Sequence, residues 1–272
     1  MTRQHLLDLA TLHHRRGRAA HGAFLVEGVR SVEAALDAGA PLVEIVVAED
    51  AAAQPRVAAL IARAGTARAT AHGATRGVPV SVVPARDAQR ISDAQASQGV
   101  VAVARGVVTR DVAALAGART AVLLDGVQDP GNVGAVVRSA AWFGIDAVVV
   151  DARTADPEGP KAVRASMGGL WDVALVRVPD LAEPLGMLAR AGVALWGADM
   201  DGTDAAAWSP GERAALVLGS EAHGLSADVT ARLDGRVTVA RAGTRDRASA
   251  GVESLNVVVA AGILLHAWRG GA

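Results

Sequence analysis

The second half of the chain repeats one pattern, in which a short and mostly apolar run is followed by a turn or loop. Two such runs, at 121–125 and 147–151, are joined by a glycine-bearing turn and a helical stretch over 132–143. Further runs follow at 173–178, 193–197, 214–219 and 236–240. Strands without polar alternation indicate a parallel sheet that is covered on both faces. The pattern therefore predicts βαβ units in an α/β domain, closed by a helix over 253–269.

The first half also alternates between strand-like and helix-like segments, but over shorter runs. The expected strands are 24–28, 42–48, 78–83 and 100–104, and the expected helices include 30–38 and 55–64. This alternation predicts a smaller α/β domain over residues 1–105. Residues 106–119 contain Gly106 and Gly117 and are predicted to be a linker, which leaves residues 120–272 for the second domain.

Charge is distributed unevenly over these two parts. The 272 residues carry 27 basic and 28 acidic side chains, for a net charge of −1. Residues 1–119 have 14 basic and 10 acidic side chains, whereas residues 120–272 have 13 and 18. The net charges are therefore +4 and −5, and a nucleic-acid partner is expected at the N-terminal part.

The composition excludes several classes of site. The absence of cysteine rules out disulfides, thiolate metal sites and a cysteine nucleophile. His13 and His14 are adjacent and no carboxylate cluster lies nearby, so no metal site is expected. The longest apolar stretches, such as 257–265, reach about half of the ~20 residues of a spanning helix. The N-terminus also lacks an apolar run of signal-peptide type, so we expect a cytoplasmic protein without a membrane partner.

The N-terminal segment has two interpretations. Leu6, Leu9 and Leu12 have helical spacing, which is typical of an amphipathic helix that buries one stripe and exposes its polar face. The alternative is a face that contacts RNA phosphates through the basic residues that follow, since arginine binds phosphate through a planar fork. The arginines of that face are Arg15, Arg16 and Arg18.

Taken singly, the glycine-bearing loops of the second half are ambiguous. The glycines at 126, 131 and 134 do not form G-x-G-x-x-G, which disfavours a nucleotide-linked dehydrogenase. Asn132 suits the N-cap position of a helix, and Ser254 suits the same position in the last helix. Positions 132 and 138 lie about 240° apart around a helix, so Asn132 and Arg138 should have separate roles if both are functional.

Together, three segments resemble the ordered motifs of the SpoU (TrmH-like) branch of the SPOUT RNA methyltransferases. They are NVGAVVRSA at 132–140, GSEAHGLS at 219–226 and ESLNVVVA at 253–260. A fourth segment, KAVRASMG at 161–168, resembles an intermediate motif of that family. The first half is similar to the L30e-like substrate-binding domain that is often fused to these enzymes, notably at 24–39 and 98–104.

The resemblance implies a trefoil-knotted parallel-sheet domain, S-adenosylmethionine as cofactor, and a homodimer with active sites near the subunit interface. Matching the family's motifs residue by residue gives three groups of site residues. The functional side chains are Asn132, Arg138, Glu221, Ser254 and Asn256. The cofactor-binding positions are Leu218, Gly219, Val239, Leu255 and Asn256. The implied RNA contact in the fourth segment is Arg164.

The implied reaction is transfer of a methyl group to a ribose 2′-hydroxyl, which needs alignment more than it needs a metal. The family picture makes Arg138 either the proton acceptor or the electrostatic anchor of the attacking oxygen. Because a guanidinium is a poor base, with a pKa above ~12, we favour the anchor. Where the family usually has Ile-Pro-Met, this chain has Val239-Ala240-Arg241, followed by a long stretch at 242–252 that either orders with ligand or touches RNA.

The sequence therefore predicts an RNA 2′-O-ribose methyltransferase that acts on ribosomal RNA. The appended N-terminal domain is the reason to prefer ribosomal over transfer RNA. The alternatives are a tRNA 2′-O-methyltransferase and a non-catalytic RNA-binding protein on the same scaffold. Retention of Asn132, Arg138, Glu221 and Asn256 together argues against the non-catalytic alternative.

Overall fold

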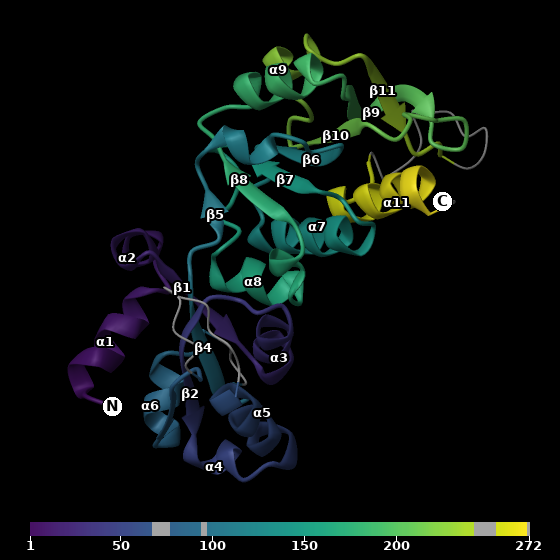
Figure 1. The fold of residues 1–272 in the computed structure, drawn as a ribbon. Helices are drawn as coiled ribbons and strands as arrows, with labels where there is room; N and C mark the ends of the chain where they lie inside the picture. The colour runs from purple at the N-terminus through teal and green to yellow at the C-terminus, as the bar shows by residue number, and fades with distance from the viewer. Residues whose placement is uncertain (67–76, 94–96, 242–253, 271–272) are drawn as a thin grey trace. The chain divides into compact units, whose positions relative to one another are not determined.

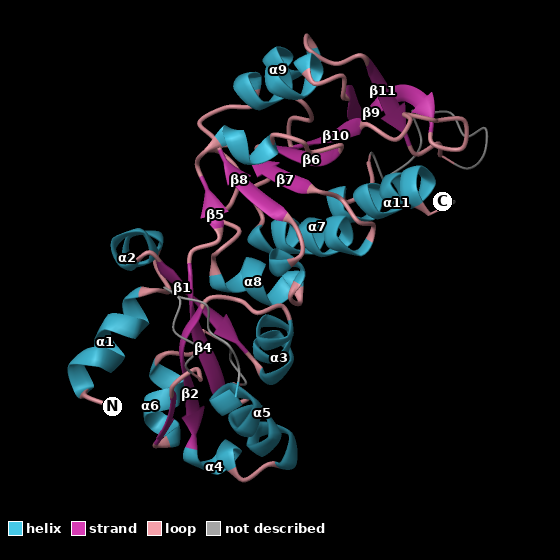
Figure 2. Cartoon of the chain, viewed as in Figure 1, coloured by secondary structure: helices cyan, strands magenta, loops and turns pink. Residues whose placement is uncertain are grey.

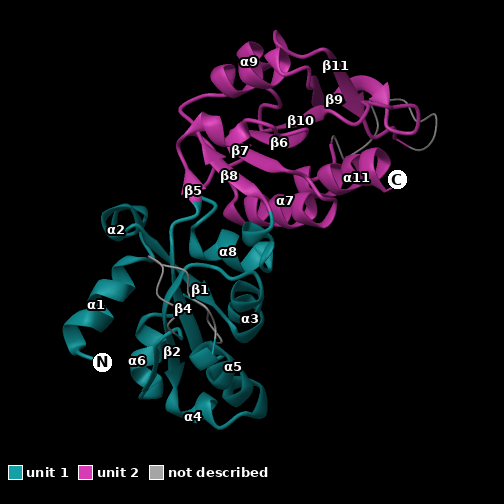
Figure 3. Ribbon diagram, viewed as in Figure 1, with its two compact units in different colours: residues 1–107, 156–172 teal, residues 108–155, 173–272 magenta. Residues whose placement is uncertain are grey.

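The chain divides into two compact units. The computed structural model describes residues 1–66, 77–93, 97–241 and 254–270. Unit 1 contains residues 1–107 and 156–172, and unit 2 contains residues 108–155 and 173–272 (Figure 3). The first division, at residue 107, falls in the predicted linker at 106–119. The predicted domains 1–105 and 120–272 did not include the return of 156–172 to the first unit.

Unit 1 is built on a four-stranded mixed sheet in the order β1-β4-β2-β3 (Figure 1). β4 pairs antiparallel with both β1 and β2, and β3 pairs parallel with β2. The strands are β1 (Ala23–Glu27), β2 (Leu42–Ala48), β3 (Val80–Val83) and β4 (Val100–Arg105). The helices are α1 (Arg3–Thr11), α2 (Arg15–His21), α3 (Val29–Asp37), α4 (Glu49–Ala52), α5 (Pro55–Thr66), α6 (Ala85–Arg90) and α8 (Pro160–Ser166), with a 3-10 turn η2 (Gly169–Trp171).

The segment 156–172 contributes to the core of unit 1. α8 packs on β1, and the Trp171 ring stacks on that of Phe24 with centroids 5.8 Å apart. Phe24 is fully buried. Leu6, Leu9 and Leu12 are also buried, so the predicted amphipathic stripe of the N-terminal helix is confirmed.

Unit 2 contains a seven-stranded sheet in the order β11-β9-β10-β6-β7-β8-β5, and every strand pair in it is parallel. The strands are β5 (Val108–Thr109), β6 (Thr120–Asp125), β7 (Ala147–Val150), β8 (Ala174–Arg177), β9 (Ala194–Asp204), β10 (Ala214–Gly219) and β11 (Gly235–Thr238). The helices are α7 (Pro130–Trp142), α9 (Ala182–Arg190), α10 (Ala227–Thr230) and α11 (Val257–Arg269), with a 3-10 turn η1 (Val112–Leu115).

Helices cover both faces of this sheet, as the unalternating apolar strands require. α7 and α11 pack side by side on one face and α9 lies on the other (Figures 1 and 2). The α9 side is filled by a buried cluster that includes Leu123, Val149, Leu185, Leu188 and Leu195. The predicted α/β class is therefore confirmed.

Two expectations depend on residues that the structure does not describe. The predicted trefoil knot and the role of the stretch at 242–252 both involve residues 242–253, which lie outside the described ranges. Both stay predictions. In the described part of the chain, no helix has the length and apolar character needed to cross a bilayer. Nor do three or more His, Asp or Glu side chains in that part come together as a metal site.

Candidate active site

The candidate site lies in unit 2, at the carboxyl ends of three strands of the parallel sheet. β6 ends at Asp125, β10 at Gly219 and β11 at Thr238. Each strand leads into a loop that the sequence marks as functional. Because parallel strands present their carboxyl ends at one edge, the sheet gathers these loops, as expected for an open α/β fold.

The loop after β6 leads into α7 through an N-cap that the sequence interpretation assigned to the wrong residue. Asp129, not Asn132, caps the helix, since its Oδ1 accepts hydrogen bonds from the amides of Gly131 (2.6 Å) and Asn132 (3.1 Å). Pro130 occupies the first helical position, where its missing N–H is no loss. The Asn132 side chain is therefore not used as a cap and points to another partner.

That partner is Glu221 in the loop after β10. Asn132 Nδ2 donates a hydrogen bond of 2.5 Å to Glu221 Oε1, which joins two motifs that lie 89 residues apart in the sequence. The loop is closed by paired backbone bonds between Ser220 and Gly224, of 3.1 and 2.8 Å. A Cβ at Gly219 would lie 2.3 Å from the Gly224 carbonyl carbon, so this close approach requires glycine.

Arg138 lies on α7, the same helix as Asn132, and has a different environment. Its side chain is exposed, and within the described ranges it makes no hydrogen bond or ion pair. Asn132 faces the Glu221 loop, whereas the Arg138 guanidinium is available to an external group. A free, permanently charged guanidinium suits binding of a phosphate or a developing oxyanion.

The loop before α11 supplies the remaining motif residues. Asn256 is the N-cap of α11 and accepts a hydrogen bond of 2.9 Å from the Val258 amide, so the alternative that placed Ser254 at this position is wrong. Ser254 and Leu255 are exposed, Leu255 to 47%. Val239 follows β11 and is half-buried.

A buried polar network that sequence reasoning missed ties the site's loops together. Asp125, at the end of β6, accepts a hydrogen bond of 2.6 Å from the Ser226 amide and pairs with the Arg153 guanidinium. Arg153 also binds Asp151 (2.8 Å), and this bond raises the pKa of Arg153 above its usual value. Asp151 accepts a hydrogen bond from the Gly126 amide (3.1 Å). The network therefore links the loops after β6, β7 and β10.

The arginines expected to bind RNA separate into two groups in unit 1. Arg15 and Arg16, on α2, are exposed and unpaired within the described residues. Arg18 is buried at 7% exposure, where it donates to the carbonyls of Leu12 and His13 (2.9 Å each) and pairs with Asp156 (2.6 Å). Arg18 therefore holds the turn between α1 and α2, and its head is not available to RNA.

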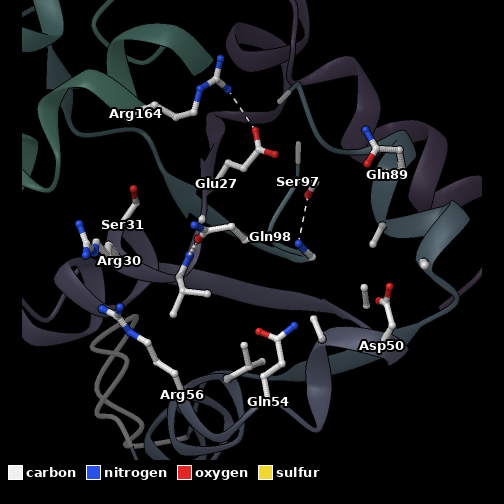
Figure 4. Close-up of a pocket in the computed structure, with 18 of the residues that line it drawn as sticks. Glu27, Arg30, Ser31, Asp50, Gln54, Arg56, Gln89, Ser97, Gln98 and Arg164 are labelled. Carbon is white, nitrogen blue, oxygen red and sulfur yellow. Dashed lines mark hydrogen bonds and ion pairs between the residues drawn. The ribbon is translucent and has the colours of Figure 1, made fainter. Parts of the chain in front are cut away.

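Arg164, on α8, is likewise engaged within unit 1. Its guanidinium pairs with Glu27 and Asp93, at 3.1 Å each. It also lines a pocket that lies where β1 and β2 end and β4 begins (Figure 4).

Comparison with known proteins agrees with this geometry. The model of the SpoU rRNA methylase family matches residues 119–266, and that of the MRM3-like substrate-binding domain matches residues 4–102. The chain therefore belongs to the SpoU rRNA methylase family, with an N-terminal substrate-binding domain. The resemblance predicted from the motifs is confirmed.

Relatives extend the likeness over the whole chain. The Bacillus subtilis 23S rRNA (guanosine(2553)-2′-O)-methyltransferase RlmP is 29% identical over 98% of this chain and 96% of its own. An uncharacterized tRNA/rRNA methyltransferase of Mycobacterium bovis is 35% identical over 70% of this chain, but the match spans only 66% of that relative's length. The SpoU methyltransferase AviRb of Streptomyces viridochromogenes, solved with AdoMet, superposes with a TM-score of 0.81 at 25% identity, over 98% of this chain and 97% of its own.

Proposed function

We propose that the chain methylates a ribose 2′-hydroxyl of ribosomal RNA, with S-adenosylmethionine as the methyl donor. The observation that carries this proposal is the hydrogen bond between Asn132 and Glu221, with Arg138 unpaired on the same helix. Membership of the SpoU family and the named activity of RlmP, a 23S rRNA 2′-O-methyltransferase, support it.

The strand ends fit the proposed cofactor. Leu218 is buried, and Gly219 packs so closely on the backbone of Gly224 that position 219 has no room for a side chain, so a cofactor at the end of β10 would meet main-chain atoms of Gly219. Leu255 and Val239 offer apolar surface of the kind that covers an adenine ring. With Asn256, these residues would hold the adenosine part.

Bound S-adenosylmethionine supplies an electrophilic methyl group on a sulfonium sulfur. The ribose oxygen would bond to the methyl carbon in line with the carbon–sulfur bond that breaks, the electron pair of that bond would stay on the sulfur as a neutral thioether, and the hydroxyl proton would pass to water. Arg138 holds the adjacent phosphate and stabilises the negative charge that develops on the oxygen. It is not the base, because a guanidinium stays protonated at any working pH.

Asn132 and Glu221 act as a positioning pair. The Asn132 amide donates a hydrogen bond to one carboxylate oxygen of Glu221. The same bond sets the orientation of the other oxygen. Fixing the carboxylate in advance removes the cost of ordering it when substrate binds. Ser254, in the loop before α11, is the remaining polar side chain of the proposed active site.

RNA recognition in unit 1 is assigned to the exposed cations Arg15 and Arg16. Such contacts release counterions, so binding weakens as the salt concentration rises. Arg18 leaves this set because it is buried. Arg164 stays in the proposed RNA-binding set, because it lines the pocket of unit 1.

The proposal includes a homodimer formed through α7 and α11. These helices pack together and expose large apolar side chains, namely Trp142 (84%), Val259 (50%) and Ile263 (40%). Val259 and Ile263 are four residues apart and share one face of α11. A second copy of the chain would cover this face. We also propose that the chain acts in the cytoplasm.

Replacement of Arg138 by alanine tests the proposed role directly. We expect methyl transfer to ribosomal RNA to fall at least a hundredfold, while calorimetric titration with S-adenosylmethionine gives an unchanged Kd. Arg190→Ala, which removes an exposed arginine from α9, is the matched control and should retain activity. Loss of cofactor binding in Arg138→Ala, or full activity, would contradict the role.

A further inference from the structure

Arg153 is an exposed cation beside the candidate active site that the proposed function does not use. It follows β7, which lies next to β6, and β6 lies next to β10 (Figure 1). A Cβ built on Gly126, the first residue after β6, would stand 3.7 Å from Arg153 Cζ and 3.8 Å from Ser220 Cβ. Ser220 directly precedes Glu221. The Arg153 guanidinium therefore borders the loop that carries one member of the positioning pair.

Two buried carboxylates hold this guanidinium by one edge. Arg153 Nε donates to Asp151 Oδ2 (2.8 Å), and Nη2 donates to Asp125 Oδ1. Both aspartate side chains are 1% exposed, whereas the Arg153 side chain is 60% exposed. The remaining N–H groups, on Nη1 and on the outer side of Nη2, form a second edge of the planar group. Within the described residues, Nη1 makes no hydrogen bond or ion pair. The second edge is therefore fixed in direction and available to an external acceptor.

The charges around Arg153 favour a neutral acceptor over an anion. The positive charge of Arg153 is already matched by the carboxylates of Asp125 and Asp151, which contact it directly. Because the Coulomb energy falls only with the inverse of distance, a phosphate at the free edge would be repelled by both carboxylates while it is attracted by the guanidinium. An uncharged oxygen or nitrogen accepts the same hydrogen bonds without this repulsion. Within an RNA strand, base edges meet that condition and phosphates do not.

The shape of the free edge narrows the choice of base. The edge presents two nearly parallel N–H donors, which match two neighbouring acceptors. Guanine offers such a pair in O6 and N7, whereas the same edge of adenine offers one acceptor and one donor. In an RNA duplex this edge lies in the deep groove, where side chains do not reach it. The guanosine that Arg153 contacts must therefore be unpaired.

We propose that Arg153 is a specificity-determining residue, which binds O6 and N7 of an unpaired guanine close to the methylated ribose. Asp125 and Asp151 hold the guanidinium in place before RNA binds, which lowers the entropic cost of recognition. Arg138 has no carboxylate partner within the described residues, so it suits the phosphate and Arg153 suits the base. The inference rests on the proposed methylation of ribosomal RNA.

The test uses the full chain, S-adenosylmethionine and two ribosomal RNA transcripts. One transcript is ordinary, and the other contains 7-deazaguanosine in place of guanosine, which replaces N7 by a carbon and keeps base pairing. The measured quantity is the ratio of kcat/KM for the ordinary transcript to kcat/KM for the 7-deaza transcript. In Arg153→Met this ratio should be about fivefold smaller than in the wild-type chain, which corresponds to one hydrogen bond. Arg153→Lys keeps a positive charge beside the two carboxylates but lacks the fork, so it should also lower the ratio, and it serves if the methionine variant does not fold.

Arg119→Met is the matched control. Arg119 is also exposed (55%) and paired with a carboxylate, that of Glu212, but it precedes β6, at the amino end of the strand. Its ratio should equal that of the wild-type chain. If the wild-type chain methylates the ordinary transcript and all four chains share one ratio, base recognition by Arg153 is overturned and the proposed function stands. An unchanged ratio with a weaker salt dependence of RNA binding in Arg153→Met would assign Arg153 to a phosphate and would also overturn it. A wild-type chain that methylates neither transcript would remove the proposed function, and this inference with it.

Discussion

Replacing Asp125 with asparagine should loosen the loops that form the candidate active site. The Asp125 side chain is 1% exposed and accepts from the Ser226 amide and from Arg153. Asparagine keeps one acceptor oxygen and turns an NH₂ group towards a donor. Loss of a buried hydrogen bond to a charged group costs about 1.5–3 kcal/mol. Because Arg153 is 60% exposed and partly screened by water, we take about 2 kcal/mol.

Scanning calorimetry measures this loss as a shift in the melting temperature of unit 2. For a unit of about 150 residues, 2 kcal/mol corresponds to a fall in Tm of about 4–8 °C. The control is Glu212→Gln, which breaks the pair with Arg119 at 82% and 55% exposure and should cost less than about 1 kcal/mol. S-adenosylmethionine should also bind the Asp125→Asn variant several-fold more weakly. If Asp125→Asn melts within 1 °C of Glu212→Gln, the network does not hold the loops.

Three further predictions concern the positioning pair, pH and assembly. Asn132→Ala and Glu221→Gln should each lower kcat. Because the two residues act through one bond, the fold-decrease in kcat of the double variant should be smaller than the product of the two single fold-decreases. A double variant whose fold-decrease equals that product would refute the pairing. Burial lowers the pKa of His13, so folding stability should fall as pH drops below about 6.5, by at most ~1.4 kcal/mol per unit. His13→Gln should flatten that dependence in urea titrations, and an unchanged slope would exclude His13 as its source. Ile263→Lys should convert the proposed dimer to a monomer in analytical ultracentrifugation, whereas a monomeric wild-type chain would contradict the proposed interface.

The strands were predictable because the apolar runs are bounded by glycine, proline or charged residues. The runs at 42–48 and 214–219 match β2 and β10 residue for residue. Helix α9 was not predicted, because Pro184 and Gly186 interrupt the helical pattern of the segment between β8 and β9. The stretch read as a linker contains β5 and η1, since a two-residue strand carries too little pattern to recognise.

The candidate site was only partly predictable, because several of its contacts join residues that are far apart in the sequence. The pairing of Asn132 with Glu221 follows from the fold, which brings both loops to one sheet edge, and the motifs named both residues. The Asp125–Ser226 bond spans 101 residues and has no local signature. Burial of Arg18 is likewise invisible in a basic run, because its partner Asp156 comes from a segment that returns to unit 1 much later in the chain. Asp129-Pro130 was the local signal that marked the true cap of α7.

Methyl transfer itself tests the central claim most directly. The wild-type chain is incubated with methyl-labelled S-adenosylmethionine and separated pools of ribosomal and transfer RNA, and the labelled position is mapped by resistance of the adjacent phosphodiester to alkali. The account predicts label in ribosomal RNA, on one ribose 2′-oxygen, and its loss in Arg138→Ala. Label on a base, label confined to transfer RNA, or no transfer to either pool would contradict it.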